Sequence, residues 1–317
     1  MESCPVELLL KIFSHICTDT GQAGCVLSLV SRRFRDISAL VRFERICLRS
    51  ALHMRIFLEM LEQRQSATVV RHLFLYDNGY SKEPEPGITT IDVCVSIISS
   101  LASSLVTLAG DLLAIKFTYG SLFCSATSFP LLRDLNLGCL GMDKITSTLI
   151  PYMPNLRRFH KFDPFSTEEY IVGFNLIVEH APQLTHIRIS NFDRSSTLPR
   201  TIDSALRRDK SSKLHLPKEL KLLIVQGIII FFFTCIDQPE MEEQDGIMKE
   251  LEAVAKKHDG LLVTPDWGDY DVRDCEVEWR EVVDQAGDGC WRNPPRMTFR
   301  AERFEQACKD FNGGLVD

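Results

Sequence analysis

The sequence predicts a mixed α+β or α/β repeat protein. A bundle of three short N-terminal helices is followed by strands and helices that alternate and wind into an irregular solenoid with a parallel sheet. Three observations predict this fold class: amphipathic helical patterns fill the first fifty residues, a Leu-x-x-Leu-x-Leu pattern recurs between residues 70 and 225, and helical stretches separate its copies. A strand followed by a helix, repeated along the chain, gives a right-handed winding in which all strands run in the same direction.

The composition is typical of a folded protein without a general affinity for polyanions. Of the 317 residues 45% are hydrophobic and 25% charged, and the net charge is -7, so binding to nucleic acid is not expected. The most apolar run, residues 222–236, is shorter than the about 20 residues that a membrane-spanning helix needs. Its β-branched and aromatic core, residues 228–233, predicts a buried parallel strand instead of a membrane span.

The cysteines indicate a reducing compartment. There are eleven, an odd number, none forms a Cys-x-x-Cys pair, and no basic segment of a secretory signal precedes them. We therefore expect reduced thiols in a cytoplasmic or nuclear protein.

The three N-terminal helices are predicted from local signals. Pro5 suits the first turn of a helix, where its missing N–H has no partner to lose, and Glu7 complements the helix dipole. We expect this helix to run to about Ile16, a second to begin at about Gln22, and a third to occupy about residues 32–43. Three helices this short make a thin core, so support from a partner or from the rest of the chain is expected.

The first helix carries more apolar surface than one interface uses. Its apolar side chains cover an arc of roughly 200°, whereas a surface helix needs a stripe of about 100°. We infer two interfaces, one with the protein's own core and one with another chain. The apolar residues of this helix are Val6, Leu8, Leu9, Leu10, Ile12, Phe13 and Ile16.

The N-terminal residues match a known motif. Pro5-x-Glu7-Leu8-Leu9-x-x-Ile12-Phe13, followed by Leu29-Val30-Ser31-x-x-Phe34-Arg35-x-Ile37-Ser38, resembles the F-box, with Cys4 where that family usually has leucine. The chain also resembles the F-box proteins that are numerous in mushroom-forming fungi. The resemblance covers about residues 3–48.

The resemblance implies a function in ubiquitin ligation. F-box proteins bind a Skp-type adaptor, which joins them to a cullin and a RING subunit, while the remainder of the chain selects the protein to be ubiquitylated. Which of the matching residues face the partner, and which face the internal core, stays open at this point. Carried over by position, the docking residues would be Pro5, Leu8, Leu9, Ile12, Phe13, Val30 and Phe34.

The middle of the chain repeats one apolar pattern. Its copies begin about 24 to 36 residues apart, near the spacing of leucine-rich repeats, which they weakly resemble. Pro130, Pro154 and Pro182 each lie two residues before a copy and favour an extended chain there. The alternative is a flat open α/β domain. The copies begin at Val70, Leu105, Leu132, Leu156, Leu184 and Leu220.

Helical stretches are predicted between the strands. One carries apolar residues from Ile91 to Leu101, another carries Ile145 and Leu149, and a third follows the capping-box signature Ser166-x-x-Glu169.

The alternation continues beyond the repeats. A helix with Ile247, Leu251 and Val254 is expected to end at Gly260 as its C-cap, and residues 261–263 are predicted to form another strand.

The C-terminal part is acidic and rich in tryptophan. Between residues 237 and 288 there are 17 acidic and 5 basic residues. Trp267, Trp279 and Trp291 with Tyr270 are expected to form a lid or tail packed on the last repeat. The group Asp269-x-Asp271-x-x-Asp274 lacks the glycine and the closing glutamate of a calcium loop, so no metal site is predicted.

A target-binding surface is predicted on the concave face of the sheet. Arginine and histidine side chains between the apolar strand positions would point outward there and select an acidic partner, although a solvated sheet surface is the alternative for each residue. The residues are Arg133, Arg157, His160, His186 and Arg188.

No motif for catalysis, phosphate binding or metal binding occurs, so no cofactor is predicted and a binding protein is favoured over an enzyme. The expected division is an F-box over residues 1–50, closed by Ile46 and Leu48, and a linking helix over 51–68. A repeat domain over 69–265 and an acidic tail or cap over 266–317 follow. The favoured function is a substrate-recognition adaptor of a Skp–cullin–F-box ubiquitin ligase. The alternatives are an F-box scaffold acting outside a ligase and an α/β enzyme.

Overall fold

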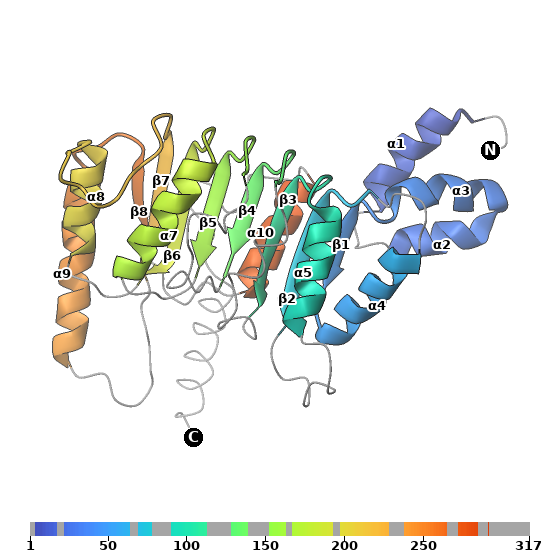
Figure 1. Cartoon of the computed structure of the whole chain (residues 1–317), viewed down its shortest axis with the longest axis horizontal. Helices are drawn as coiled ribbons and strands as arrows, with labels where there is room; N and C mark the ends of the chain where they lie inside the picture. Colours follow the sequence, from blue (N-terminus) through green and yellow to red (C-terminus); the bar gives the residue numbers. More distant parts are fainter. Residues whose placement is uncertain are drawn as a thin grey trace, which may run out of the picture.

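The centre of the molecule is an eight-stranded open sheet in which every pair of neighbours is parallel (Figure 1). The strands lie in the order β1 to β8, the order of the chain. The computed structural model describes residues 4–17, 22–63, 69–77, 90–112, 128–138, 152–162, 167–192, 197–227, 238–264, 272–284 and 291. Parallel strands and intervening helices are therefore as the sequence predicted.

The strands are β1 (Arg45–Leu48), β2 (His72–Asp77), β3 (Thr107–Leu112), β4 (Asp134–Leu137), β5 (Arg158–Phe162), β6 (His186–Phe192), β7 (Leu222–Gly227) and β8 (Leu261–Thr264). The described helices are α1 (Val6–Ile16), α2 (Gln22–Val30), α3 (Arg32–Val41), α4 (Ala51–Gln63), α5 (Thr90–Leu101), α7 (Thr167–His180), α8 (Leu198–Leu206), α9 (Gln238–Ala255) and α10 (Val272–Val283).

The first three helices form a small separate core. Leu9 and Phe13 of α1 pack with Ile37 of α3, and the rings of Phe13 and Phe34 meet edge to face at 5.1 Å. Ser31 begins α3 as its N-cap, because its side-chain oxygen accepts a hydrogen bond from the backbone N–H of Phe34. The predicted bounds of these helices are confirmed to within two residues.

The sheet begins earlier than expected. Ile46 and Leu48, expected to close the helical unit, lie in β1, where Ile46 is the parallel partner of Leu73. Both are buried in the main core with Met54 of α4. Residues 45–48 therefore belong to the sheet and not to the helical unit, because they pair with β2.

Each copy of the repeated pattern supplies one strand, from β2 to β7. The leading residue of each copy lies just before its strand, and five of the six are fully buried. The predicted helices that begin near residues 90 and 167 are α5 and α7, and the predicted strand at 261–263 is β8. The predicted helix at Ile145 and Leu149 and the predicted strand at 228–233 lie outside the described residues.

The two faces of the sheet carry different layers. The main core lies between the sheet and α4, α5, α7, α8 and α9. On the opposite face, which we call the α10 face, Phe74, Ala109 and Phe162 pack against Cys275 and Trp279 of α10 (Figure 1). Helix α10 contacts β2 and β3, so Trp279 of the expected lid packs on early strands and not on the last repeat. Trp267 and Tyr270 lie outside the described residues.

Gly260 has a different function from the one predicted. Helix α9 ends at Ala255, so Gly260 is not its C-cap but the residue directly before β8. Its φ is +85°, and a Cβ there would lie 2.6 Å from the carbonyl oxygen of Lys221. Glycine is therefore required both by the backbone conformation and by the close approach of the neighbouring strand.

The described helices include none that is both long and apolar enough to cross a membrane. The longest, α9, has 18 residues and carries acidic side chains along most of its length. The apolar run that starts at Leu222 forms β7 as far as Gly227, and its remainder lies outside the described residues.

Candidate functional site

A set of exposed apolar side chains lies on α1 and α2, and we call it the apolar ledge. Leu8 and Ile12 of α1 are 50% and 41% exposed, and Leu29 and Val30 of α2 are 80% and 63% exposed. Side chains of this size normally lose most of their contact with water on folding. The ledge consists of Val6, Leu8, Ile12, Ile16, Val26, Leu29 and Val30.

Helical spacing explains why one helix has both a buried and an exposed apolar side. Leu9 and Phe13, one turn apart, form the stripe of α1 that faces the internal core. Leu8 and Ile12, also one turn apart, form the next stripe around the helix, which is exposed. The predicted excess of apolar surface is therefore present.

The structure divides the predicted docking residues. Pro5, Leu8, Ile12 and Val30 are exposed, as docking requires. Leu9 and Phe13 are buried, so of the residues left open they are the ones that face the internal core. The reason is that the thin helical core has few other large side chains to fill it.

Phe34 is half-buried against Phe13 and belongs mainly to the same core. Sequence reasoning left out Val6, Ile16, Val26 and Leu29. For Ile16, Val26 and Leu29 the available signal was their i+3 or i+4 spacing with other members of the ledge, whereas Val6 has no such neighbour.

The α10 face holds a buried polar network. The Arg188 guanidinium has no exposed surface, and its Nη1 lies 3.2 and 3.3 Å from the two carboxylate oxygens of Glu278 on α10. Its Nε donates to Gln226 Oε1 at 3.1 Å. Ser190 Oγ donates to the same oxygen at 2.7 Å and lies 2.9 Å from His160 Nε2. The predicted target-binding function of Arg188 and His160 is therefore wrong, because α10 and this network occupy them.

Two histidines of this face are held in the neutral form. Burial, and then the charges of Arg188 and Lys161, lower the pKa of His160 well below its usual range. Burial, and then Arg45 and Arg71, lower the pKa of His72 to about 4. The ring of His72 lies 3.1 Å from Thr107 Oγ1.

Side chains around the network fasten α10 to the sheet. Trp279 Nε1 donates to Thr107 Oγ1 at 3.1 Å, and its ring lies 5.5 Å from that of Phe74. Arg45 pairs with Asp284 at 2.6 Å, and the guanidinium of Arg49 binds both carboxylate oxygens of Glu276. Acidic and aromatic residues of α10 therefore cover much of the face where a target was expected.

An open hollow of about 650 Å³ lies at the N-terminal edge of β4 to β7. Arg133, Arg157 and Lys221 each precede a strand directly. The carbonyl of Arg133 accepts hydrogen bonds from the backbone N–H groups of Arg157 and Arg158, which places Arg133 and Arg157 side by side at the start of neighbouring strands. We call this the basic hollow, and the lining residues used below are Arg133, Asp134, Arg157, Arg158, His186, Glu219 and Lys221.

The hollow brings together three of the five predicted target-binding residues, namely Arg133, Arg157 and His186. Burial, followed by the charges of Arg158 and Lys221, lowers the pKa of His186, while Asp134 opposes the shift. The imidazole meets the indole of Trp291 edge to face at 5.8 Å. His186 therefore forms a wall of the hollow, and its lowered pKa favours the neutral imidazole.

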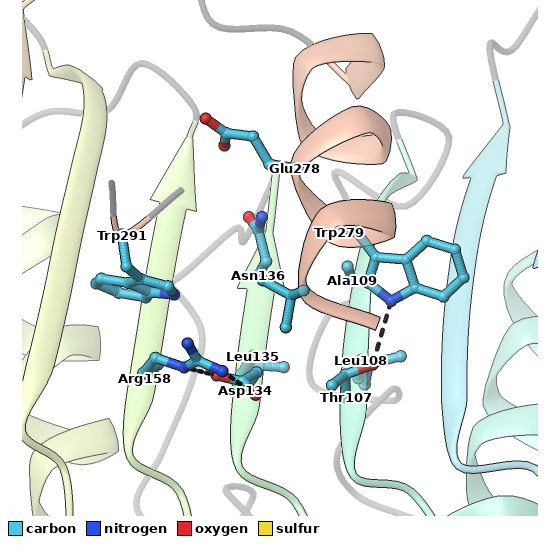
Figure 2. Close-up of a pocket in the computed structure, with 11 residues that line it drawn as sticks. Thr107, Leu108, Ala109, Asp134, Leu135, Asn136, Arg158, Glu278, Trp279 and Trp291 are labelled. Atoms are coloured by element: carbon cyan, nitrogen blue, oxygen red, sulfur yellow. Dashed lines mark hydrogen bonds and ion pairs between the residues drawn. The ribbon is translucent and has the colours of Figure 1, made fainter. Parts of the chain in front are cut away.

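A narrow slot separates α10 from β3 to β5, between Trp279 and Trp291 (Figure 2). Its volume of about 30 Å³ is far below the about 300 Å³ of a small-molecule site. The Asn136 side chain lies between the two indoles, and its buried Oδ1 has no hydrogen-bond partner among the described residues (Figure 2). The slot is therefore a packing defect with one orphaned acceptor.

Asn136→Leu is expected to raise the free energy of unfolding by about 1 kcal/mol, because it removes a buried acceptor without a donor while keeping the side-chain shape. Urea denaturation followed by circular dichroism measures this change. Asn155→Leu is the control. Asn155 Nδ2 donates to the Pro130 carbonyl at 2.6 Å, so its loss should lower stability. Equal losses in both variants would contradict the assignment.

The described residues offer no site for a metal, and the pKa values of two of their buried thiols are raised. No group of three His, Cys, Asp or Glu side chains among them is placed to hold a metal ion. Asp269 and Asp271 of the acidic triplet lie outside the described residues. Burial, more than the neighbouring acidic groups, raises the pKa of Cys94 to about 12 and that of Cys47 to about 11, which suppresses the nucleophilic thiolate.

No protein-family model matches this chain, and no curated protein matches it. What the protein does is therefore inferred from its own residues and their geometry.

Proposed function

We propose that this chain is a substrate-recognition adaptor of a Skp–cullin–F-box ubiquitin ligase. Its N-terminal helices would dock a Skp-type adaptor, and its repeat domain would hold a target protein. The observation that carries this proposal is the apolar ledge. Leu9, Phe13 and Ile37 already fill the small helical core, so the ledge is left for another chain.

Burial energy favours a partner on the ledge. Complete burial of one large aliphatic side chain stabilises by about 1.5 to 3 kcal/mol, and seven such side chains of α1 and α2 are at least two-fifths exposed. Exposed apolar residues gathered on one small unit are typical of protein interfaces. A partner would also supply the support that three short helices with a thin core require.

The order of the strands favours a leucine-rich-repeat-like solenoid over a flat α/β enzyme. In doubly wound enzymes the strand order reverses, and ligands bind at that reversal beyond the carboxyl ends of the strands. Here the order runs from β1 to β8 without a reversal. A pocket at the carboxyl edge of the sheet would favour an enzyme, and the residues that follow most of the strands there lie outside the described part of the chain.

The mechanism would be proximity. A target held on the repeat domain is brought near a ubiquitin-charged enzyme, which raises the effective concentration of its lysines without bond chemistry by this chain. A scaffold acting outside a ligase is the alternative. Co-purification of a cullin with the full-length chain and its Skp-type adaptor separates the two functions.

Ile12→Asp tests the docking surface. The new carboxylate would lie within the docking surface and lose its hydration on binding, so affinity for a purified Skp-type adaptor is expected to fall at least about 100-fold. Isothermal titration calorimetry with the full chain measures the affinity. Because Ile12 is 41% exposed, the circular dichroism spectrum should not change.

Leu131→Asp is the matched control, because Leu131 is 49% exposed and lies just before β4, far along the sheet from α1. Its affinity for the adaptor should equal that of the wild type. Equal binding by the Ile12 variant and the Leu131 variant would refute docking through the ledge.

A further inference from the structure

The basic hollow has a charge opposite to that of the whole chain. The net charge of the chain is -7, yet four of the lining residues are arginine or lysine and two are acidic. Arg158 is already paired, because its Nη2 donates to Asp134 Oδ2 at 2.8 Å. The cations left over are Arg133, Arg157 and Lys221, and Glu219 is the remaining acid.

These three cations make no ion pair within the described part of the chain. Arg133 and Arg157 directly precede neighbouring strands, which lie about 4.8 Å apart in a sheet. Thr185, just before β6, lies between Arg157, just before β5, and Lys221, just before β7. Like charges on neighbouring strands repel one another. An anion that enters the hollow would reduce this repulsion and so lower the electrostatic free energy of this edge.

The α10 face is different, because its arginines already have acidic partners. Arg45, Arg49 and Arg188 pair with Asp284, Glu276 and Glu278 of the α10 segment. Among the described residues, Arg133, Arg157 and Lys221 therefore lie without an ion pair at the N-terminal edge of β4 to β7 and not beneath α10.

We propose that the basic hollow binds a carboxylate-rich peptide segment in an extended conformation. Alternate side chains of such a segment lie about 6.6 Å apart on one side. Flexible arginine side chains that precede neighbouring strands can therefore each reach one carboxylate of the segment. Arginine also binds a carboxylate with two parallel hydrogen bonds. Glu219 repels acidic groups, which directs them to Arg133 and Arg157.

Only the identification of this segment as part of a ubiquitylation target rests on the proposed function. A peptide fits better than a nucleic acid, because a chain of net charge -7 repels a long polyanion, and the hollow holds only a short stretch of it.

The test uses the full-length chain and a fluorescein-labelled peptide of alternating glutamate and alanine, with fluorescence anisotropy as the readout. The same peptide with glutamine in place of glutamate should not bind. The double variant Arg133→Glu, Arg157→Glu should bind the glutamate peptide at least about tenfold more weakly. Both side chains are exposed, so the fold should be retained, as circular dichroism would verify.

The control is the double variant Arg200→Glu, Lys256→Glu, which changes the net charge by the same amount. Both residues are exposed, Arg200 on α8 and Lys256 just after α9, and neither lines the hollow. Its affinity should stay within about twofold of the wild type, because distant surface charges are screened. No binding by the wild type, or equal losses in both double variants, would overturn the proposal. Tighter binding of single-stranded DNA with the same arginine dependence would also overturn it.

The two proposals fail separately. The Arg133, Arg157 double variant should bind the Skp-type adaptor as the wild type does, and Ile12→Asp should bind the glutamate peptide as the wild type does. A failed adaptor titration therefore leaves peptide binding intact, and a failed peptide titration leaves adaptor docking intact.

Discussion

Glu278→Ala is expected to lower the free energy of unfolding by about 3 to 5 kcal/mol and to detach α10 from the sheet. The substitution leaves the fully buried Arg188 guanidinium without its carboxylate partner, and an uncompensated buried charge is among the most destabilising changes known. Urea denaturation followed by circular dichroism measures the loss. Limited proteolysis of α10 should become faster in the variant.

Two further variants isolate the cause. Val277→Ala, at a 40% exposed position of α10, should change stability by less than about 0.5 kcal/mol. Replacing both charged partners, Arg188→Met with Glu278→Leu, should recover most of the loss, because a buried ion pair can be exchanged for apolar groups of similar volume. An unchanged urea midpoint in Glu278→Ala would mean that the pair does not hold α10.

Acid is expected to destabilise the protein between about pH 6.5 and pH 4. The folded pKa of His72 is about 4, against 6.5 for an ordinary histidine, so the unfolded chain binds more protons in this window. The stabilisation is therefore complete above about pH 6.5 and is lost as the pH falls. At 1.36 kcal/mol per pKa unit, His72 alone contributes about 3 kcal/mol, and His160 shifts in the same direction.

Urea denaturation at pH 7 and at pH 5 measures this effect. His72→Asn should reduce the difference in stability between the two pH values, since the side chain that takes up the proton is gone. His15→Asn, at an exposed position of α1, should leave the difference unchanged. Identical pH dependence in the wild type and in His72→Asn would show that acid acts elsewhere.

The N-terminal helices could be predicted from sequence, but which apolar residues of α1 are buried in the internal core and which are exposed could not. Leu8, Leu9, Ile12 and Phe13 belong to one apolar arc, and hydrophobicity alone gives each the same preference for burial. Packing against Ile37 and Phe34 selects Leu9 and Phe13 for the inside. That choice depends on how α3 lies against α1, which local spacing does not encode.

The repeat predicted the strands because its apolar positions recur at every second residue of most strands and face the main core. The place of α10 could not be predicted in this way. Glu278 and Arg188 are 90 residues apart, and no local pattern connects an acidic helix with an arginine on a strand. For the same reason the sequence grouped His160 and Arg188 with Arg133 and Arg157. All four lie in or beside strands, but only the second pair lies at the open edge.

The passage from α3 to β1 has a mechanical consequence. Helix α3 ends at Val41 and β1 begins at Arg45, and the residues between them are themselves packed. The Arg42 guanidinium lies 4.4 Å from the ring centre of Phe43, and the carbonyl of Glu44 accepts the backbone N–H groups of Arg71 and His72. Because only three residues join α3 to β1, we expect the three N-terminal helices to keep a nearly constant orientation relative to the sheet. In the proposed ligase, a target bound to the sheet would keep a constant orientation relative to the ubiquitin-charged enzyme. Only lysines of the target within a fixed distance of that enzyme would then be modified.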